Sequence, residues 1–193
     1  VLMPQVLRHS DRVVTVAEAE QRAIETHYPF MQGRGHFGFL QNGGLPNGAL
    51  KAALAAPAPA METRGYGLYL GSLTRRKNAE GILRAAIAFL ERYPEMRFVV
   101  IGASGASFEG VTLEVPPALA DRLEFRGQIN EAQRIYEACA GARFLLFPSF
   151  YEASPLPPIE AMSFGCPVIA SEIPSLTERC GAAALYCQPG DQG

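Results

Sequence analysis

Tryptophan is absent from this 193-residue sequence, and so is any apolar run near the roughly 18 to 20 residues that a membrane-spanning helix needs. The longest apolar runs, at 98–101 and 144–147, have the length of buried strands. An excess of basic charge is also lacking: 17 Lys and Arg face 19 Asp and Glu, which argues against a nucleic-acid partner. Together these features predict a soluble globular protein.

Closely spaced cysteine pairs are missing as well, and so are histidines in the C-terminal four fifths of the sequence. The four cysteines, Cys139, Cys166, Cys180 and Cys187, form no CxxC pair, and no histidine follows His36. This spacing argues against a zinc site, and we expect no metal. Because the cysteines lie in or beside apolar stretches, we expect buried or partly buried free thiols, which fits a reducing, cytoplasmic compartment. The first residues contain no signal-peptide pattern.

The first 41 residues predict one strand-helix-strand piece. A β-branched run, a helix-forming stretch and a short apolar run follow one another, at 12–16, 17–27 and 37–40. Such a piece is too small to hold a core alone. Residues 42–65, rich in Gly, Pro and Ala, predict a linker, in which a helix from residue 49 ends at Pro57 and a stiff, exposed connector follows.

Residues 66–193 alternate short apolar runs with helical patterns. The strands are predicted at 66–70, 97–101, 123–126, 144–147, 167–170 and 184–187. The helices are predicted at 78–93, 130–140, 157–165 and 174–180. Asn78 and Asn130 are the N-cap candidates of the first two helices. Helical spacing predicts that Tyr93 lies on the buried stripe of the first helix and that Ala132 faces inward on the second. The alternation of strands, apolar on both faces, with helices predicts an α/β fold with a doubly wound, Rossmann-like parallel sheet. Such sheets bind ligands at the carboxyl ends of their strands, where loops lead into helices.

The first of these loops, G-S-L-T-R-R-K-N at 71–78, places Gly71 directly after a strand and three cations at a helix N-terminus. Gly71 would let a ligand approach the backbone closely. Cations oppose the helix dipole at this end, so an anion between them would be stabilising. We therefore favour phosphate binding by Arg76 and Lys77 over a solvated basic turn.

Two further loops carry weaker signals. Gly102 opens a G-A-S-G sequence after the second strand of this region, which is either a tight turn or a backbone contact to a ligand. Gly127 follows the third strand. There the backbone of Gln128 and Ile129 either binds the edge of a base or simply forms a turn.

Two carboxylates eight residues apart, Glu152 and Glu160, mark the fourth loop. Pro157 and Pro158 suit the first turn of a helix, so Glu160 lies in that turn and Glu152 in the loop before it. Both can accept hydrogen bonds from vicinal hydroxyls of a sugar or ribose. In the alternative, Glu160 only compensates the helix dipole and Glu152 is solvated. A glycosidase-like acid/base pair is less favoured, because nothing indicates a carboxyl group in an apolar pocket.

These motifs together resemble the donor-binding half of the family-four (group 1) retaining glycosyltransferases of the GT-B fold. The sequence E-A-S-P-L-P-P-I-E-A-M-S-F-G-C-P-V at 152–168 is similar to the family's E-x7-E motif and the G-x-P-V strand after it. The loop Y-L-G-S-L-T-R-R-K-N at 69–78 is similar to the family's first-loop motif. The segments H-S-D-R-V-V-T-V-A-E-A-E and F-L-Q-N-G resemble the end of the family's N-terminal domain.

The resemblance implies transfer of a hexose from a nucleotide-diphosphate sugar, GDP-mannose-like or a UDP-sugar, to a glycan or lipid-linked acceptor. It assigns residues 1–41 to the tail of an acceptor domain and 66–193 to a donor domain that lacks its last helices. We therefore expect this chain to be a piece of a longer protein, which could associate peripherally with a membrane.

The same resemblance assigns roles to individual residues. Lys77, helped by Arg76, would contact the donor diphosphate, and Glu152 would face the donor sugar hydroxyls; Lys77 and Glu152 are the expected catalytic residues. Glu160 would bind the nucleotide ribose. Further donor contacts would come from the loop amides near Ser154 and Leu156.

The chain departs from the family pattern at two places. Many members carry Arg where this chain has Ser72, so Arg75 or Arg76 would supply that charge. The family's G-F-G-L is here A-S-P-L, and Pro155 has no N–H to donate. Two other functions stay open: a sugar-nucleotide epimerase of the same fold, and a non-catalytic nucleotide-binding module.

Overall fold

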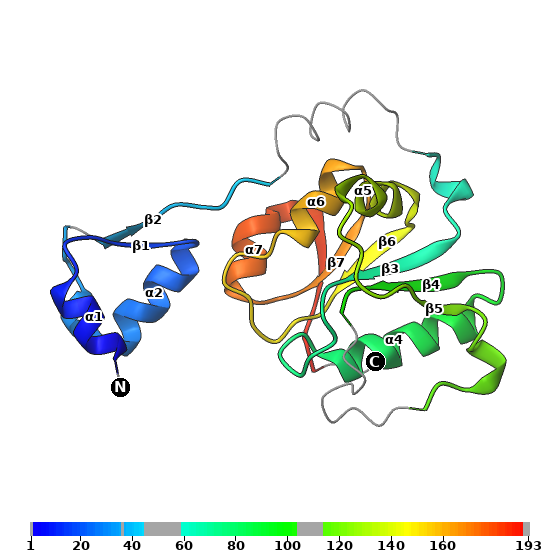
Figure 1. Ribbon diagram of the computed structural model, residues 1–193, viewed down its shortest axis with the longest axis horizontal. Helices are drawn as coiled ribbons and strands as arrows, with labels where there is room; N and C mark the ends of the chain where they lie inside the picture. Colours follow the sequence, from blue (N-terminus) through cyan, green and yellow to red (C-terminus); the bar gives the residue numbers. More distant parts are fainter. Residues whose placement is uncertain (1, 36, 45–58, 104–113, 191–193) are drawn as a thin grey trace.

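The computed structural model describes residues 2–35, 37–44, 59–103 and 114–190. Two sheets lie in separate parts of the molecule, a small one near the N-terminus and a large one formed by the rest (Figure 1). The linker helix predicted from residue 49 to Pro57 lies outside the described residues. Among the helices of the described residues, none combines the length and the apolar character that a membrane span requires.

The N-terminal part is a strand-helix-strand piece, as predicted. Strands β1 (Val13–Thr15) and β2 (Phe37–Phe39) pair in parallel around helix α2 (Glu18–His27), which is followed by a short 3₁₀ helix (Pro29–Met31). An additional helix, α1 (Met3–His9), precedes them and was not predicted. Pro4 lies in the first turn of this helix, a favourable position for proline.

The large sheet has six parallel strands in the order β5-β4-β3-β6-β7-β8. They are β3 (Tyr66–Leu70), β4 (Arg97–Ile101), β5 (Leu123–Phe125), β6 (Phe144–Phe147), β7 (Val168–Ser171) and β8 (Ala184–Cys187). This order confirms the doubly wound sheet, because the chain starts at the centre and builds outward first on one side and then on the other. The register places the carboxyl ends of β3 and β4 side by side, Leu70 opposite Ile101.

Helices cover both faces of this sheet (Figure 1). They are α4 (Ala79–Arg92), α5 (Ala132–Gly141), α6 (Pro157–Ser163) and α7 (Pro174–Cys180), with 3₁₀ helices at Met61–Thr63, Pro117–Leu119 and Gly181–Ala183. Successive strand residues face opposite layers: Leu68 packs into a core with Cys139 of α5 and Leu176 of α7, whereas Tyr69 packs with Ile82 of α4. This two-sided burial explains why the strands are apolar throughout.

Several local predictions were wrong. Helix α5 begins at Ala132 with Glu131 as N-cap, and Asn130 instead accepts a hydrogen bond from Gln128 Nε2 (2.9 Å). Ala132, predicted to face inward, is exposed. Tyr93, predicted on the buried stripe of α4, is 46% exposed, because the helix ends one residue before it. Helical periodicity predicts a face only as far as the helix extends.

The four cysteines are free thiols, as predicted. Cys139, Cys166 and Cys180 are buried and Cys187 is partly buried. Burial raises the pKa of the Cys166 thiol to about 12, and raises the pKa of Cys139 and Cys180 as well. These three thiols therefore stay protonated and pack as small apolar groups.

Asn78 caps α4, as predicted, and also ties that helix to two other loops. Its backbone is left-handed (φ 62°), its Oδ1 accepts from Gly81 N (3.1 Å), and its Nδ2 donates to Pro148 O (3.1 Å) and Pro189 O (2.7 Å). One side chain thus satisfies a helix N–H and two carbonyls from separate loops.

Replacing Asn78 by alanine should lower the free energy of unfolding by about 2 to 3 kcal/mol, through the lost cap and the unpaired carbonyls. Asn78→Asp is the matched control. It keeps the capping oxygen but sets a carboxylate oxygen against the Pro148 and Pro189 carbonyls in place of the N–H donor, so it should also be destabilising, through these two contacts and not through the cap. Urea unfolding followed by circular dichroism measures both, and equal stability of Asn78→Ala and the parent would contradict the assignment.

Candidate functional site

The loops after β3, β4 and β5 are joined by backbone hydrogen bonds at the carboxyl edge of the sheet. Gly71 N donates to Ile101 O, and Gly102 N donates to Gly127 O, each at 2.9 Å. Gly71 (φ 140°) and Gly102 (φ 155°) both have positive φ angles. A Cβ on Gly102 would lie 1.9 Å from Gly71 O. The two loops therefore approach closely because Gly102 carries no side chain.

A pocket of about 230 Å³ opens at this edge. Its lining includes five of the predicted donor-binding residues, Gly71, Gly102, Gln128, Ile129 and Glu160. The remaining lining is mainly apolar and comes from Leu70, Ile101, Ile135 and Pro157. The pocket thus combines backbone groups, an apolar surface and one carboxylate, a combination that suits an organic ligand with polar groups.

Glu160 supplies the carboxylate of this pocket. It lies in the first turn of α6, where the helix dipole favours negative charge. Burial raises the pKa of Glu160. Among the described residues its side chain forms no hydrogen bond or ion pair. A half-buried carboxylate without a partner can accept hydrogen bonds from a ligand's hydroxyl groups.

A second group of side chains surrounds Glu152, which is only 6% exposed. Lys77 Nζ lies 2.5 Å from Glu152 Oε1, and Arg76 Nη1 lies 3.2 Å from Oε2. The ammonium group of Lys77 also lies 4.9 Å from the ring centroid of Phe147. Lys77 is therefore fixed by Glu152 and Phe147, whereas the half-exposed Arg76 side chain leaves part of its positive charge at the surface.

The structure therefore places the predicted residues in two groups. Arg76, Lys77 and Glu152 form the ion cluster, and none of the three lines the pocket. The backbone oxygen of Ser72 accepts a hydrogen bond from the Tyr69 hydroxyl (2.9 Å). Burial and the nearby Glu152 raise the pKa of Tyr69. Leu156 is the N-cap residue of α6.

Ser154 Oγ is buried and has no hydrogen-bond partner among the described residues. A buried hydroxyl without a partner costs free energy, unless a ligand or water completes it. This hydroxyl lies in the same loop as Glu152, where a polar ligand could complete its hydrogen bonding. Within the described residues, no three or more His, Cys, Asp or Glu side chains lie close enough together to hold a metal ion.

Two aromatic residues beside the ion cluster were not predicted as part of the site. Phe147 lies against the Lys77 ammonium group, and Tyr151 O accepts a hydrogen bond from Arg76 Nη1 (2.9 Å). Phe147 had been considered only as a strand residue. Tyr151 could have been predicted to lie beside the ion cluster from its position in the sequence, because it directly precedes Glu152.

Comparison with known proteins agrees with this geometry. Residues 64–193 match the model of the family described as "Glycosyl transferases group 1". The chain belongs to the group 1 glycosyltransferases. This assignment confirms the resemblance found in the sequence motifs, and it covers both the pocket and the ion cluster.

Curated relatives of this group 1 chain are bacterial glycosyltransferases. O-antigen chain mannosyltransferase B of Escherichia coli is 37% identical over 134 residues, 66% of this chain and 34% of the relative. A D-inositol 3-phosphate glycosyltransferase of Nocardiopsis dassonvillei is 26% identical over 186 residues, 90% of this chain and 42% of the relative. The chain thus spans about a third to two fifths of these proteins.

Solved structures agree on the fold of this group 1 chain. Sucrose-phosphate synthase from Thermosynechococcus elongatus superposes with a TM-score of 0.71 at 26% identity, over 99% of this chain and 48% of the other. TarM superposes with a TM-score of 0.74 at 15% identity, over 98% and 36%, a likeness that concerns the fold alone. These neighbours are GT-B glycosyltransferases, which confirms that the large sheet is of the predicted GT-B type.

Proposed function

We propose that the whole protein containing this chain is a retaining hexosyltransferase, and that residues 66–193 bind its nucleotide-diphosphate sugar donor. The observation that carries this proposal is the pocket of about 230 Å³ whose Glu160 carboxylate has no partner within the described part of the chain. The names of the mannosyltransferase relatives favour mannose as the sugar, and hence a GDP-mannose-like donor over a UDP-sugar. A glycan or lipid-linked molecule would be the acceptor.

In this proposal the nucleoside occupies the pocket. Glu160 would accept hydrogen bonds from the ribose hydroxyls, and the backbone around Gln128 and Ile129 would contact the base. Gly71 and Gly102 would let the diphosphate approach the loop backbone, since no side chain intervenes.

The ion cluster would act on the diphosphate and the sugar. Lys77 and Arg76 would stabilise the negative charge that grows on the leaving diphosphate, so that no metal ion is required. Glu152 lies 2.5 Å from Lys77 Nζ and 3.2 Å from Arg76 Nη1, an arrangement that would orient both cations toward the donor. Glu152 would then orient the sugar through its hydroxyls.

Acceptor binding would belong to the domain that ends with residues 1–41, joined through the linker 42–65. We therefore propose that this 193-residue chain binds the donor and transfers no sugar by itself. Turnover by the chain alone would contradict this part of the proposal.

Titration calorimetry with GDP-mannose, UDP-glucose and GDP tests the donor proposal. Glu160→Gln should weaken GDP and GDP-mannose about equally, by roughly 10- to 150-fold, the range for hydrogen bonds to a charged group. Glu152→Gln should weaken GDP-mannose more than GDP. Glu137→Gln, on the exposed face of α5, is the control and should change neither. Absence of binding to every nucleotide sugar would refute the proposal, and sugar interconversion without acceptor would favour an epimerase.

A further inference from the structure

Helix α2 begins without a capping side chain of its own. Its N-cap residue is Ala17, whose side chain has no oxygen to accept from the first N–H groups of the helix. Thr15, just before it, uses its hydroxyl to donate to Ala17 O (2.8 Å). The first N–H groups of a helix have no partner within the helix, so α2 depends on an acceptor from elsewhere.

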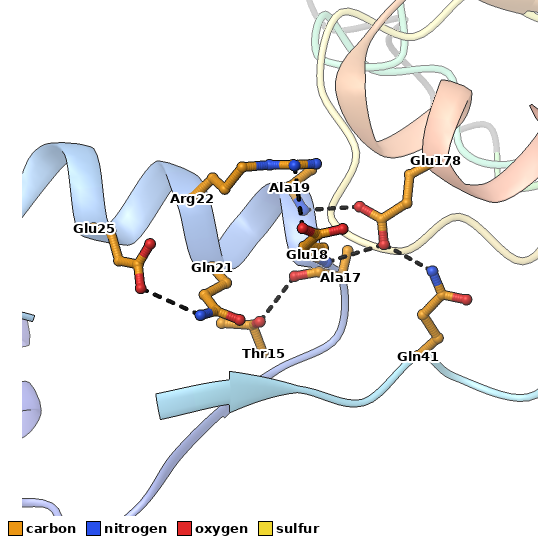
Figure 2. Close-up of polar contacts among 9 residues, drawn as sticks. All are labelled: Thr15, Ala17, Glu18, Ala19, Gln21, Arg22, Glu25, Gln41 and Glu178. Atoms are coloured by element: carbon orange, nitrogen blue, oxygen red, sulfur yellow. Dashed lines mark hydrogen bonds and ion pairs between the residues drawn. The ribbon is translucent and has the colours of Figure 1, made fainter. Parts of the chain in front are cut away.

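That acceptor is Glu178, about 160 residues away in α7 of the large domain (Figure 2). Its Oε1 accepts from Glu18 N (2.9 Å) and its Oε2 accepts from Ala19 N (2.8 Å). Gln41, where the N-terminal part leads into the linker, donates from Nε2 to the same Oε1 (2.7 Å). One carboxylate therefore holds both the beginning of α2 and the chain that leaves β2.

The position of Glu178 within its own helix is unfavourable for a negative charge. It lies in the last turn of α7, where the helix dipole disfavours negative charge. The favourable partner is the positive end of α2. Burial raises the pKa of Glu178, whereas the hydrogen bonds from Glu18 N, Ala19 N and Gln41 lower it. The hydrogen bonds together outweigh burial, so the pKa lies below its ordinary value. The folded arrangement therefore stabilises the charged form.

A second contact holds the same turn of α2 from the side of the ion cluster. Tyr151 OH donates to Glu20 Oε1 at 2.6 Å, while Tyr151 O accepts from Arg76. The first turn of α2 is thus bound both by α7 and by the loop that carries Glu152. Two separate contacts restrict the rotation of α2 relative to the large sheet, whereas a single contact would allow it.

We propose that Glu178 is a positioning residue that fixes the angle between the N-terminal part and the donor-binding domain by capping α2 across the boundary between them. Because acceptor binding is assigned to the N-terminal side, a role in aligning acceptor with donor rests on the proposed function. The interdomain cap itself does not, since it involves no donor residue.

The test uses NMR on the 193-residue chain without any nucleotide. Residual dipolar couplings of α2 and of the strands β3, β4 and β6 report whether the two parts keep one relative orientation. Glu178→Ala should abolish the common orientation and accelerate hydrogen exchange at the Glu18 and Ala19 amides, on the order of tenfold. The strand amides should keep their protection, which shows that the large domain remains folded.

A second variant separates the interdomain role from simple helix stability. Ala17→Ser supplies a local cap, because a serine at this extended position can accept from the helix N–H groups. In the double variant Ala17→Ser/Glu178→Ala, the exchange protection of α2 should recover while the fixed orientation does not. A fixed orientation in Glu178→Ala, or its recovery in the double variant, would overturn the proposal.

The same variants distinguish this proposal from the proposed function. Glu178→Ala should leave the affinity for GDP-mannose unchanged, because Glu178 lies outside both the pocket and the ion cluster. If no nucleotide sugar binds the parent chain, the donor proposal fails, and the orientation measurements still decide the role of Glu178.

Discussion

Replacement of Gly102 by alanine is expected to lower the free energy of unfolding by about 4 kcal/mol or more, a large part of the roughly 5 to 15 kcal/mol that stabilises a domain. The new Cβ would lie 1.9 Å from Gly71 O and 2.5 Å from Gly71 C. Both are backbone atoms, and Gly71 N is held by Ile101 O, so neither loop can retreat without breaking the edge of the sheet. Urea unfolding measures the loss.

Gly127→Ala is the matched control for this steric effect. Gly127 also has a positive φ angle (66°), but no atom lies within 4 Å of its missing Cβ. Alanine there should cost only the roughly 1 to 2 kcal/mol of a left-handed backbone. Equal losses in the two variants would show that the close approach of the loops does not limit residue 102.

Gly102 also shows how much of the site could be predicted from the sequence. Its position after an apolar run predicted a loop at the ligand-binding edge, with a turn and a ligand contact as the two explanations. The structure adds a third reason for glycine, the neighbouring loop at Gly71. That contact depends on β3 lying beside β4, and strand order is not encoded in local spacing.

The strands and most helices could be predicted because their signals are local. Residues 98–101 are apolar on both faces, and Asn78 offers both a cap and a tolerance for left-handed backbone. Asn130 has the same chemistry but failed as a cap, because its side chain pairs with Gln128 instead. Local capping rules do not show which partner a side chain will choose.

The ion cluster could be predicted only in part. Charge and motif pointed to Lys77 and Glu152 as separate donor contacts, and the resemblance gave each a role. Their direct pairing arises because β3 and β6 are neighbours in the sheet, which brings the loops after them together. The cap that Glu178 provides for α2 was not predicted, since nothing in the sequence around residue 178 indicates that its carboxylate accepts from a helix 160 positions earlier.

Replacement of Lys77 by methionine should weaken both the fold and the binding of nucleotide diphosphates. Glu152 is only 6% exposed and would keep Arg76 as its remaining cation. Removing one partner of a buried pair costs about 3 to 5 kcal/mol, and the retained Arg76 should hold the loss near the lower value. Binding of GDP should fall by roughly 10- to 150-fold, since a charged hydrogen-bond donor to the diphosphate is lost.

The double variant Lys77→Met/Glu152→Gln separates these two effects. The amide keeps the shape of Glu152 and its oxygen can still accept from Arg76, while no unpaired charge remains buried. Stability in urea should therefore recover most of its loss, whereas titration calorimetry should still show weak GDP binding. If GDP affinity returned together with stability, Lys77 would act only by neutralising Glu152, and the diphosphate would have to be bound by Arg76 and the loop backbone.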